Sequence, residues 1–364
     1  MKIALVVHDL DNYRGHGHYV RVLAEALSAH HKVTVFANTC THLGESRWDL
    51  CPVRAWRVNA VASVCTFPIG LALLKHRLGE FDILHTQGYC GGRPNVVTAH
   101  ICLAAYLRSL SEISTRTWCS LRLMALAESR FYRGYRGAII AASQGLANDL
   151  RHFYEVRGPV YVVPHGVDSD RFTSANRGRF RARIRRELGI ADDQTLALYV
   201  GDLTKAHTYL KALAQITPDV RFAIVTASRQ YQWSAPNVRF HEPTAVIEHF
   251  YSAADAFVFP TCYDAFAMVV LEAMASGLPV FSSDRAGAAE LIDPGRDGFV
   301  SALRDWVETT SAALREVGSL LSVGRAAEET ARRHDWTSVV CAVKKVYNQV
   351  VTSELGHGGE GPEK

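Results

Sequence analysis

The chain has 364 residues, about twice the usual length of one domain, so two domains are expected. Apolar residues make up 48% and charged residues 21%, which excludes a disordered chain, a collagen-like repeat and a coiled coil. The 40 basic residues exceed the 36 acidic ones by only four, too weak a bias for a dedicated nucleic-acid-binding protein.

The start of the chain lacks the pattern of a secretion signal, because no small-residue cleavage site follows the short apolar run 3–7. The eight cysteines are scattered without a C-x-x-C pair, so a reducing cytoplasm is the expected location. The longest apolar run, 60–74, has 15 residues and contains Pro68 and Gly70. It is short of the roughly 20 residues that span a bilayer, and we expect a buried helix or a strand followed by a helix.

The first half of the chain alternates between strand and helix patterns. The strand pattern 3–7 is followed by a glycine-rich loop, and apolar residues then recur at helical spacing between Tyr19 and Leu27. Further strand patterns follow at 33–36, 81–85, 95–100 and 137–142. These runs are apolar throughout rather than alternating, which favours a parallel sheet covered on both faces.

The second half begins the same alternation again. Strand patterns at 196–201, 221–225, 238–240, 256–259 and 279–282 alternate with helix patterns at 209–216, at 246–253 and before Gly277. The segment 168–193 joins the halves, and it contains a helix pattern at 179–188 whose arginines we expect to be solvated. The glycine- and charge-rich residues 355–364 are expected to form a disordered tail.

The most informative stretch is 260–279, which has the order strand, loop, helix, glycine stop, strand. A helix that begins near Ala267 or Met268 presents free N–H groups and the positive end of its dipole to an anion. Asp264 lies before this helix and Glu272 within it, up to about 12 Å apart at 1.5 Å per residue. They are too distant to share a metal, but they could hold opposite ends of a long ligand. A helix cap and a surface glutamate are the alternative interpretations.

This stretch resembles the E-x7-E region of the family-4 retaining glycosyltransferases of GT-B fold. Asp264-x7-Glu272 matches that region in spacing, and Phe266, Leu271 and Ala273 match it in identity. Further segments resemble the family's motifs in the same order along both halves: 163–168, 201–206, 286–291 and 335–336. Several ordered matches are far more specific than one glycine-rich loop.

The resemblance implies an α/β protein of GT-B fold, with two Rossmann-like domains facing across a cleft. Residues 1–168 would bind the acceptor, 169–335 would bind the nucleotide sugar, and a helix over about 336–352 would cross back to the first domain. The implied activity is retaining transfer from a nucleoside-diphosphate sugar, with a UDP-sugar favoured as co-substrate and no other cofactor. The implied acceptor is a glycan, a lipid-linked glycan or a small molecule.

The resemblance also implies roles for the donor-site residues. Glu272 would accept hydrogen bonds from the ribose hydroxyls, and Asp264 would hold hydroxyls of the transferred sugar. Lys205 would neutralise charge on the leaving group, a stabilisation of the oxyanion-hole type. Backbone N–H groups at Ala267, Met268 and Val269 would face the diphosphate, and Phe266 and Gly201 complete the set.

In the first half, Gly15 and Gly17 occupy the loop that the family places against the donor phosphates and the acceptor. Positive φ or a close backbone approach would require glycine there, and an ordinary turn is the alternative. His100, at the end of its strand, matches the position where relatives place a residue near the reacting sugar. A structural histidine is the alternative. Weaker candidates are His16, His18, His85, His165 and His207.

The chain departs from the family pattern at the donor site. Asp264 replaces a glutamate, and Ala267 is one of two alanines that replace glycines. Asp202 stands where the family usually has a phosphate-binding arginine. Lys205 is therefore expected to act alone or with another basic residue such as Arg229.

No metal site is expected, because the sequence contains neither a D-x-D motif between apolar runs at a strand end nor a histidine pair at i, i+4 with an attendant glutamate. Two other functions stay open. A nucleotide-sugar 2-epimerase shares the architecture, although its acid and base motifs are not found. A catalytically silent GT-B binding module is the second, given Asp202.

The stretch 105–136 carries six arginines against two glutamates, with aromatic and aliphatic residues between them. One interpretation is a peripheral contact with an anionic membrane at its inner face, which agrees with the lipid-linked acceptors of many relatives. The other is a core-facing helix pair whose arginines are solvated. No nucleic-acid partner is expected.

Overall fold

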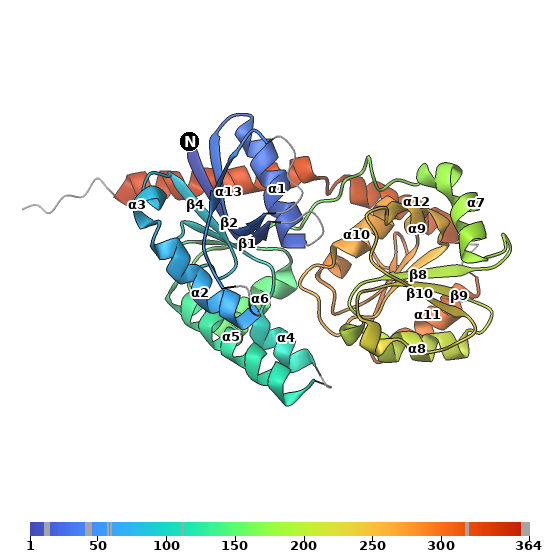
Figure 1. The fold of residues 1–364 in the computed structure, drawn as a ribbon. Helices are drawn as coiled ribbons and strands as arrows, with labels where there is room; N and C mark the ends of the chain where they lie inside the picture. Colours follow the sequence, from blue (N-terminus) through green and yellow to red (C-terminus); the bar gives the residue numbers. More distant parts are fainter. Residues whose placement is uncertain are drawn as a thin grey trace, which may run out of the picture. The chain divides into compact units, whose positions relative to one another are not determined.

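The computed structural model describes residues 1–10, 15–40, 46–56, 58, 60–110, 113–316 and 320–357. The chain divides into two compact units (Figure 1). Unit 1 comprises Met1–His165 and Thr337–Lys364, and unit 2 comprises Gly166–Trp336. The division falls at 165/166, where the sequence motifs indicated 168/169.

Unit 1 is built on a seven-stranded parallel sheet with the order β3-β2-β1-β4-β5-β6-β7. Its strands are β1 (Lys2–Leu10), β2 (Lys32–Cys40), β3 (Asp49–Pro52), β4 (Ile83–Gln87), β5 (Val96–Ala99), β6 (Ala138–Ala141) and β7 (Val160–Val162). The central strands β4, β5 and β6 are buried along their whole length. Burial on both faces explains their continuous apolar runs.

Helices cover both faces of this sheet (Figure 1). They are α1 (Gly15–Ser28), α2 (Ala60–Ala72), α3 (Lys75–Leu78), α4 (Leu103–Ser109), α5 (Thr115–Gly134), α6 (Gln144–Tyr154) and the final helix α13 (Trp336–His357). The helical pattern predicted after the glycine-rich loop is confirmed, since Tyr19, Val20, Leu23, Ala24 and Leu27 form the buried face of α1. Most of the apolar run 60–74 forms α2, which buries Phe67 and Leu71 but exposes Ile69, and Leu73 in the turn after the helix is also exposed.

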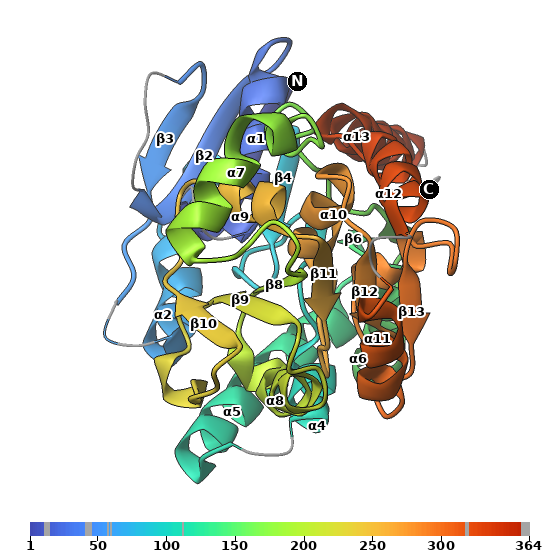
Figure 2. The same cartoon turned by 90° about the vertical axis from the view of Figure 1, so that its right-hand side faces the viewer.

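Unit 2 is built on a six-stranded parallel sheet with the order β10-β9-β8-β11-β12-β13. Its strands are β8 (Leu196–Val200), β9 (Arg221–Val225), β10 (Val238–His241), β11 (Ala256–Phe259), β12 (Val280–Ser283) and β13 (Phe299–Ser301). Helices α7 (Asn176–Leu188), α9 (Glu248–Ala253), α10 (Met268–Ala275) and α12 (Leu321–Arg332) lie on one face, and α8 (His207–Ile216) and α11 (Trp306–Leu314) on the other (Figure 2). Both units are therefore Rossmann-like, as predicted.

The expectation that the arginines of the α7 segment are solvated is wrong for three of the six. Arg177, Arg181 and Arg185 are spaced four residues apart, so they share one helix face, and all three contact Asp255. The side chain of Arg185 is only 1% exposed and lies 3.0 Å from the Asp255 carboxylate. These guanidinium groups also donate to the last carbonyls of α9, which lack intrahelical partners. The other three arginines of the cluster are exposed.

The two connections between the units meet within unit 2. A Cβ atom on Gly166 would lie 2.9 Å from the backbone of Trp336, so only glycine fits in the 163–168 motif at this crossing. Val167 N donates to His334 O at 3.0 Å. Helix α13 then continues to His357, three residues into the predicted disordered tail. The glycine-rich composition led to the prediction of disorder. Residues 355–357 are helical because a helix that has already formed adds one hydrogen bond for each further residue. Residues 358–364 lie outside the described part of the chain.

None of the helices within the described residues combines the length and apolar character that crossing a membrane requires.

Candidate functional site

The donor-site candidates of unit 2 gather after β8 and β11. Gly201 follows β8 directly, and the 3-10 turn η1 (Leu203–Lys205) carries Lys205. Asp264 lies in the loop after β11, and α10 follows that loop. Backbone hydrogen bonding joins the two segments, because Cys262 N donates to Lys205 O at 3.2 Å. Carboxyl ends of parallel strands are where open α/β sheets bind ligands.

Lys205 and Asp264 form an ion pair in which Nζ lies 3.3 Å from Oδ2. Their side chains are 19% and 27% exposed, so the pair is partly desolvated yet reachable by a ligand. The sequence assigned these residues to different parts of a donor. The structure brings the cation and the carboxylate into direct contact.

The loop that carries Asp264 is bound to the turn η3 (Gly287–Leu291). Asp264 N donates to Arg285 O, and Gly287 N donates to Asp264 O, each at 2.9 Å. Ala288 N donates to Phe266 O at 2.5 Å. The segments 264–273 and 286–291, which resemble two separate family motifs, therefore support each other through backbone hydrogen bonds.

Helix α10 begins at Met268, as predicted, and Ala267 before it has φ 68°. This left-handed conformation favours glycine, the residue that the family usually has there. The first intrahelical bond is donated by Val270 N to Ala267 O. The N–H groups of Ala267, Met268 and Val269 precede that bond and are the groups that a helix start offers to an anion.

Glu272 is not a solvated surface residue. It is partly buried, and Tyr251 Oη donates to its Oε2 at 3.0 Å. Burial raises the pKa of this carboxyl to about 7, although the Tyr251 hydrogen bond and the charge of Arg171 act in the opposite direction. A carboxylate poised near neutral pH and held by a fixed donor can accept hydrogen bonds from ligand hydroxyls.

Asp202 has a structural role that the sequence analysis missed. Its Oδ1 accepts hydrogen bonds from Thr204 N at 3.0 Å and from Ser228 Oγ at 2.6 Å. Partial burial alone would raise the pKa of Asp202, but these hydrogen bonds hold it below its usual value. Asp202 thus caps the turn that carries Lys205, and the Asp-x-Thr spacing was the available signal. The guanidinium of Arg229, the other basic residue considered for the donor phosphate, is exposed and pairs with Glu242 at 2.8 Å.

Glycine is required at position 201 for two reasons, the backbone conformation and the close approach of Tyr199. Its φ is 154°, and a Cβ atom would lie 3.0 Å from the hydroxyl oxygen of Tyr199. That hydroxyl in turn donates to Asp202 O at 2.9 Å. The glycine therefore lets the strand end turn tightly into the capped segment.

In unit 1, Gly15 and Gly17 form the start of α1. Both lie within the helix, so of the two reasons for glycine given above, positive φ does not apply. Gly15 is exposed and Gly17 is buried against the rest of the unit. Residues 11–14, which precede them, lie outside the described chain.

His100 is surrounded by other aromatic rings of unit 1. Its ring stacks on His16 at 4.2 Å and on His165 at 5.3 Å, and Tyr19 packs edge-on at 5.3 Å. Burial, together with the neighbouring His16, His165 and His85, lowers the pKa of His100 well below its usual value. The sequence named these other histidines as weaker candidates, and the structure gathers them around His100. His207 is elsewhere, in unit 2, where its Nδ1 lies 3.1 Å from Leu203 O.

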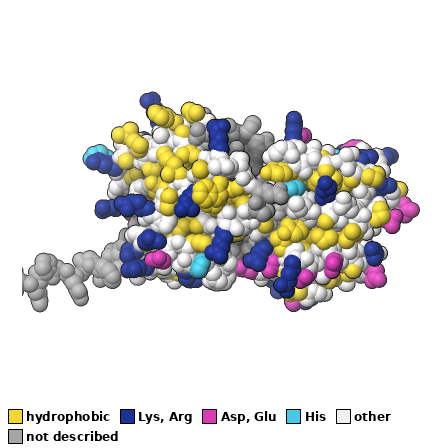
Figure 3. Space-filling view, turned by 90° about the horizontal axis from the view of Figure 1, so that it is seen from below, with side chains coloured by type: hydrophobic (Ala, Val, Ile, Leu, Met, Phe, Trp, Pro, Cys, Tyr) yellow, Lys and Arg dark blue, Asp and Glu magenta, His cyan; other side chains and the backbone are white. Residues whose placement is uncertain are grey.

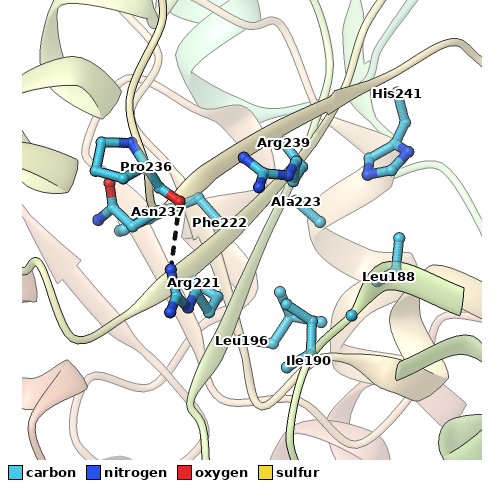
Figure 4. A pocket seen from close by; sticks show the side chains of 11 residues that line it. Leu188, Ile190, Leu196, Arg221, Phe222, Ala223, Pro236, Asn237, Arg239 and His241 are labelled. Atoms are coloured by element: carbon cyan, nitrogen blue, oxygen red, sulfur yellow. Dashed lines mark hydrogen bonds between the residues drawn. The ribbon is translucent and has the colours of Figure 1, made fainter. Parts of the chain in front are cut away.

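A separate cavity of about 150 Å³ lies over the edge of the unit 2 sheet (Figure 4). Arg221, Arg239 and His241 line it together with apolar residues from the end of α7 and from β8. None of the predicted donor residues lines this cavity. In the described chain, no group of three or more His, Cys, Asp or Glu side chains is placed to hold a metal ion.

Two family models match the chain. Residues 13–171 match "Glycosyltransferase Family 4", and residues 194–319 match "Glycosyl transferases group 1". A D-inositol 3-phosphate glycosyltransferase of Streptomyces avermitilis is 27% identical over 343 residues, covering 79% of this chain and 69% of that protein.

Solved structures agree with the family matches in fold. Sucrose-phosphate synthase from Thermosynechococcus elongatus has a TM-score of 0.79 and 20% identity, covering 97% of this chain and 99% of that one. HepE from Anabaena, solved in complex with UDP-glucose, has a TM-score of 0.70 and 18% identity, covering 98% of this chain and 100% of that one. With both halves of the chain matched and the two Rossmann-like units observed, the chain belongs to the family-4-type glycosyltransferases of GT-B fold.

Proposed function

We propose that the chain transfers a sugar from a nucleoside-diphosphate sugar, with a UDP-sugar as the favoured donor, to an acceptor hydroxyl with retention of configuration. The observation that carries the proposal is the contact of Lys205 with Asp264 beside the start of α10, with Glu272 half-buried in the same helix. The UDP-glucose complex of the Anabaena structure supports the choice of donor.

The donor would be held by groups of opposite charge in unit 2. Glu272, oriented by Tyr251, would accept hydrogen bonds from the ribose hydroxyls. The N–H groups of 267–269 and the positive end of the α10 dipole would bind the diphosphate. Lys205 would move from Asp264 toward the phosphate, which frees the Asp264 carboxylate to accept hydrogen bonds from the sugar.

The reaction would break the bond between the anomeric carbon and the phosphate oxygen and form a bond from that carbon to the acceptor oxygen on the same face. The departing phosphate oxygen would take the acceptor proton. Negative charge on the leaving group would be met by Lys205 and the start of α10, without a metal ion. In unit 1, Gly15, Gly17 and His100 would contact the donor phosphates, the acceptor and the reacting sugar.

The acceptor would be a glycan, a lipid-linked glycan or a small molecule. The D-inositol 3-phosphate glycosyltransferases among the relatives make a small polyol phosphate the first acceptor to try. A panel of UDP-, GDP- and ADP-sugars labelled in the sugar, with and without this acceptor, tests the reaction. Transfer or slow donor hydrolysis supports the proposal, whereas a free epimer indicates a 2-epimerase. Binding without any product indicates a silent module.

Glu272→Ala tests the donor site itself. We expect the affinity for UDP-glucose to fall by about 2 kcal/mol or more, because charge-assisted hydrogen bonds contribute about that much. Glu308→Ala is a matched control, since Glu308 is exposed on α11, on the other face of the unit 2 sheet from α10. An unchanged affinity in Glu272→Ala would rule out the ribose role.

We also propose that unit 1 binds an anionic membrane surface through α5. This helix exposes Trp118, Leu123 and Leu126 beside exposed Arg116 and Arg122. Its single acidic residue is buried in the unit. Figure 3 shows hydrophobic and basic side chains on this side of unit 1, at the left of the view, with few acidic ones. Exposed apolar and basic side chains of this kind interact more favourably with an anionic membrane surface than with water.

Flotation with vesicles containing phosphatidylglycerol tests this surface. We expect binding that weakens with salt and that is lost in the double variant Leu123→Ser, Leu126→Ser. Arg304→Glu in unit 2, where the arginine is 86% exposed and pairs with its neighbour Asp305, serves as the control. Exposed Cys119 on α5 can carry an environment-sensitive dye. Binding that is absent, or equal for the double variant and wild type, would contradict the membrane contact.

A further inference from the structure

Three buried polar side chains lie on one face of the unit 1 sheet. His85 and Gln87 are two residues apart on β4, so they point to the same face, and Thr98 on β5 is the register partner of Gln87. Their exposed fractions are 0%, 5% and 0%. Buried polar groups are retained in a core only when they are hydrogen-bonded, so the partners of these side chains define what the array does.

His85 bonds at both ring nitrogens. Its Nδ1 lies 2.7 Å from Tyr347 Oη on α13, and its Nε2 lies 2.7 Å from Thr98 Oγ1. Burial lowers the pKa of His85 to about 3, so the ring is neutral at ordinary pH. His85 therefore joins the final helix to the middle of the sheet. Its ring is held in one position beside Gln87.

Gln87 connects this array to His100. Its Oε1 lies 2.8 Å from Nε2 of His100, and its amide nitrogen lies 3.5 Å from Nε2 of His85. An amide oxygen can only accept a hydrogen bond, so the His100 nitrogen that faces it must carry the proton. In a neutral imidazole the other nitrogen then has the lone pair.

We propose that Gln87 is a positioning residue for His100, whose imidazole it holds in the Nε2–H tautomer so that Nδ1 is left as a hydrogen-bond acceptor. Because Gln87 is buried, the ring is held in one orientation and one tautomer before any ligand binds. This inference rests on the proposed function, in which His100 would face a sugar hydroxyl. Nδ1 would accept a hydrogen bond from that hydroxyl.

The groups around His100 favour this neutral acceptor state. His16 and Tyr19 face it from α1, His165 faces it from the segment after β7, and His85 lies beyond Gln87 on β4. Besides burial, the groups that lower the pKa of His100 are His16, His165 and His85. An imidazolium there would lie among further histidines, which disfavours protonation and preserves the lone pair.

Nitrogen-15 NMR of histidine-labelled protein tests the tautomer directly and needs no enzymatic activity. His100→Gln identifies the His100 signals by their loss. We expect wild-type His100 to show a protonated Nε2, and Gln87→Met to show a mixture of tautomers or a change to Nδ1–H. A wild-type Nδ1–H tautomer, or a spectrum of Gln87→Met identical to that of wild type, would overturn the proposal.

The kinetic test uses the charged analogue Gln87→Glu. Its carboxylate still accepts the Nε2–H bond but raises the pKa of His100, so the acid limb of the kcat profile is expected to move to higher pH. Gln87→Met is expected to lower kcat about 10- to 100-fold, the loss that follows removal of the residue orienting a metal-ligating histidine, with the KM for the donor nearly unchanged. A merely structural role would leave the acid limb in place, and that result would overturn the proposal.

Tyr347→Phe is the matched control, because it removes a hydroxyl from the same buried array but not the bond between Gln87 and His100. It is expected to keep the Nε2–H tautomer. The arms also separate the two proposals. If the tautomer depends on Gln87 but no nucleotide sugar yields product, the proposed function fails and the positioning stands. If transfer occurs and Gln87→Met matches wild type in both tests, the positioning fails alone.

Discussion

At Asp255, one carboxylate is the counter-charge for three arginines. Its two oxygens contact Arg181 at 2.6 Å and Arg185 at 3.0 Å, and Arg177 lies 3.5 Å away. Arg185 is almost completely buried, so its charge cannot be solvated by water if the carboxylate is removed. A buried charge without its partner is costly, whereas an exposed one is not.

Asp255→Ala is therefore expected to lower the free energy of unfolding by about 3–5 kcal/mol. Glu187→Ala breaks a pair of exposed side chains with Arg183 on the same helix and is expected to cost under about 0.5 kcal/mol. Urea unfolding of both variants provides the comparison. Similar losses in the two variants would show that Arg185 is not dependent on Asp255.

The carboxyl of Glu272 links donor binding to pH. Its pKa of about 7 in the unliganded protein means that much of it is protonated just below neutrality. Only the ionised form accepts hydrogen bonds at both oxygens. A donor that needs the carboxylate must then displace a proton when it binds.

We expect the Kd of UDP-glucose to be constant above about pH 7.5 and to rise about tenfold for each pH unit below 7. Titration calorimetry between pH 8 and pH 5.5 measures this slope. Glu272→Gln is expected to bind more weakly at pH 8 and to lose the slope, whereas Asp264→Asn should keep it. A wild-type Kd that does not change with pH would argue against ribose binding by Glu272.

At the scale of elements, the start of α10 stores backbone strain. Ala267 adopts φ 68°, where a side chain costs about 1–2 kcal/mol, and the loop is held there by its hydrogen bonds to η3. The alanine is 7% exposed, so a larger side chain would also meet packed neighbours. The strain lies at the position where the proposed diphosphate contact begins.

Ala267→Gly is expected to raise the free energy of unfolding by about 0.5 kcal/mol or more, since relief of strain exceeds the added freedom of the unfolded chain. Ala182→Gly, in the exposed interior of α7, is expected to lower it by about 0.5–1 kcal/mol. Thermal unfolding of the two variants should therefore shift in opposite directions. A destabilised Ala267→Gly would contradict the strain.

The strands and helices that bury a continuous or periodic apolar pattern could be predicted from the sequence. Strands β8 and β11 and the start of α10 are of this kind, because local apolar runs determine them. The short strands β3 and β13 could not, since their exposed or half-exposed residues form no run. The left-handed conformation of Ala267 could not be predicted from the alanine itself, and only the glycine that the family usually has at this position was a signal for positive φ.

The candidate site was predictable only where residues lie near each other in sequence or follow a known motif. Asp264 and Glu272 belong to one segment and were found together. The contact of Lys205 with Asp264 spans 59 residues, and the bond of His85 to Tyr347 spans 262. Such contacts depend on strand order, which the sequence pattern does not contain.

For the whole molecule, buried neutral histidines set the response to acid. Burial lowers the pKa of His85 and of His165 to about 3, from about 6.5 in an unfolded chain. Between these values the unfolded chain binds protons that the folded chain does not, so stability falls as pH drops from about 6.5 toward 3. Glu128 and Glu272, whose pKa values burial raises to about 7, act in the opposite direction between about pH 4.5 and pH 7.

His165→Asn isolates one of these contributions, because asparagine is polar but does not titrate. Relative to wild type, the variant is expected to gain about 1.4 kcal/mol of stability for each pH unit below 6.5, with no pH dependence of the difference above pH 7.5. Urea unfolding at pH 7.5, 6 and 5 measures the difference. A difference that does not grow toward pH 5 would mean that His165 is protonated in the folded protein.

Unit 2 has the form of a domain inserted into the chain of unit 1, and its two ends, Gly166 and Trp336, lie side by side. The chain enters unit 2 and leaves it at two points whose backbones touch, with a Cβ on Gly166 only 2.9 Å from Trp336. A segment whose ends are adjacent can be gained, lost or exchanged without displacing the flanking chain. Genetic replacement of 166–336 by the equivalent segment of a relative would therefore exchange the proposed donor half while leaving Gln87, His100 and Tyr347 in their own unit.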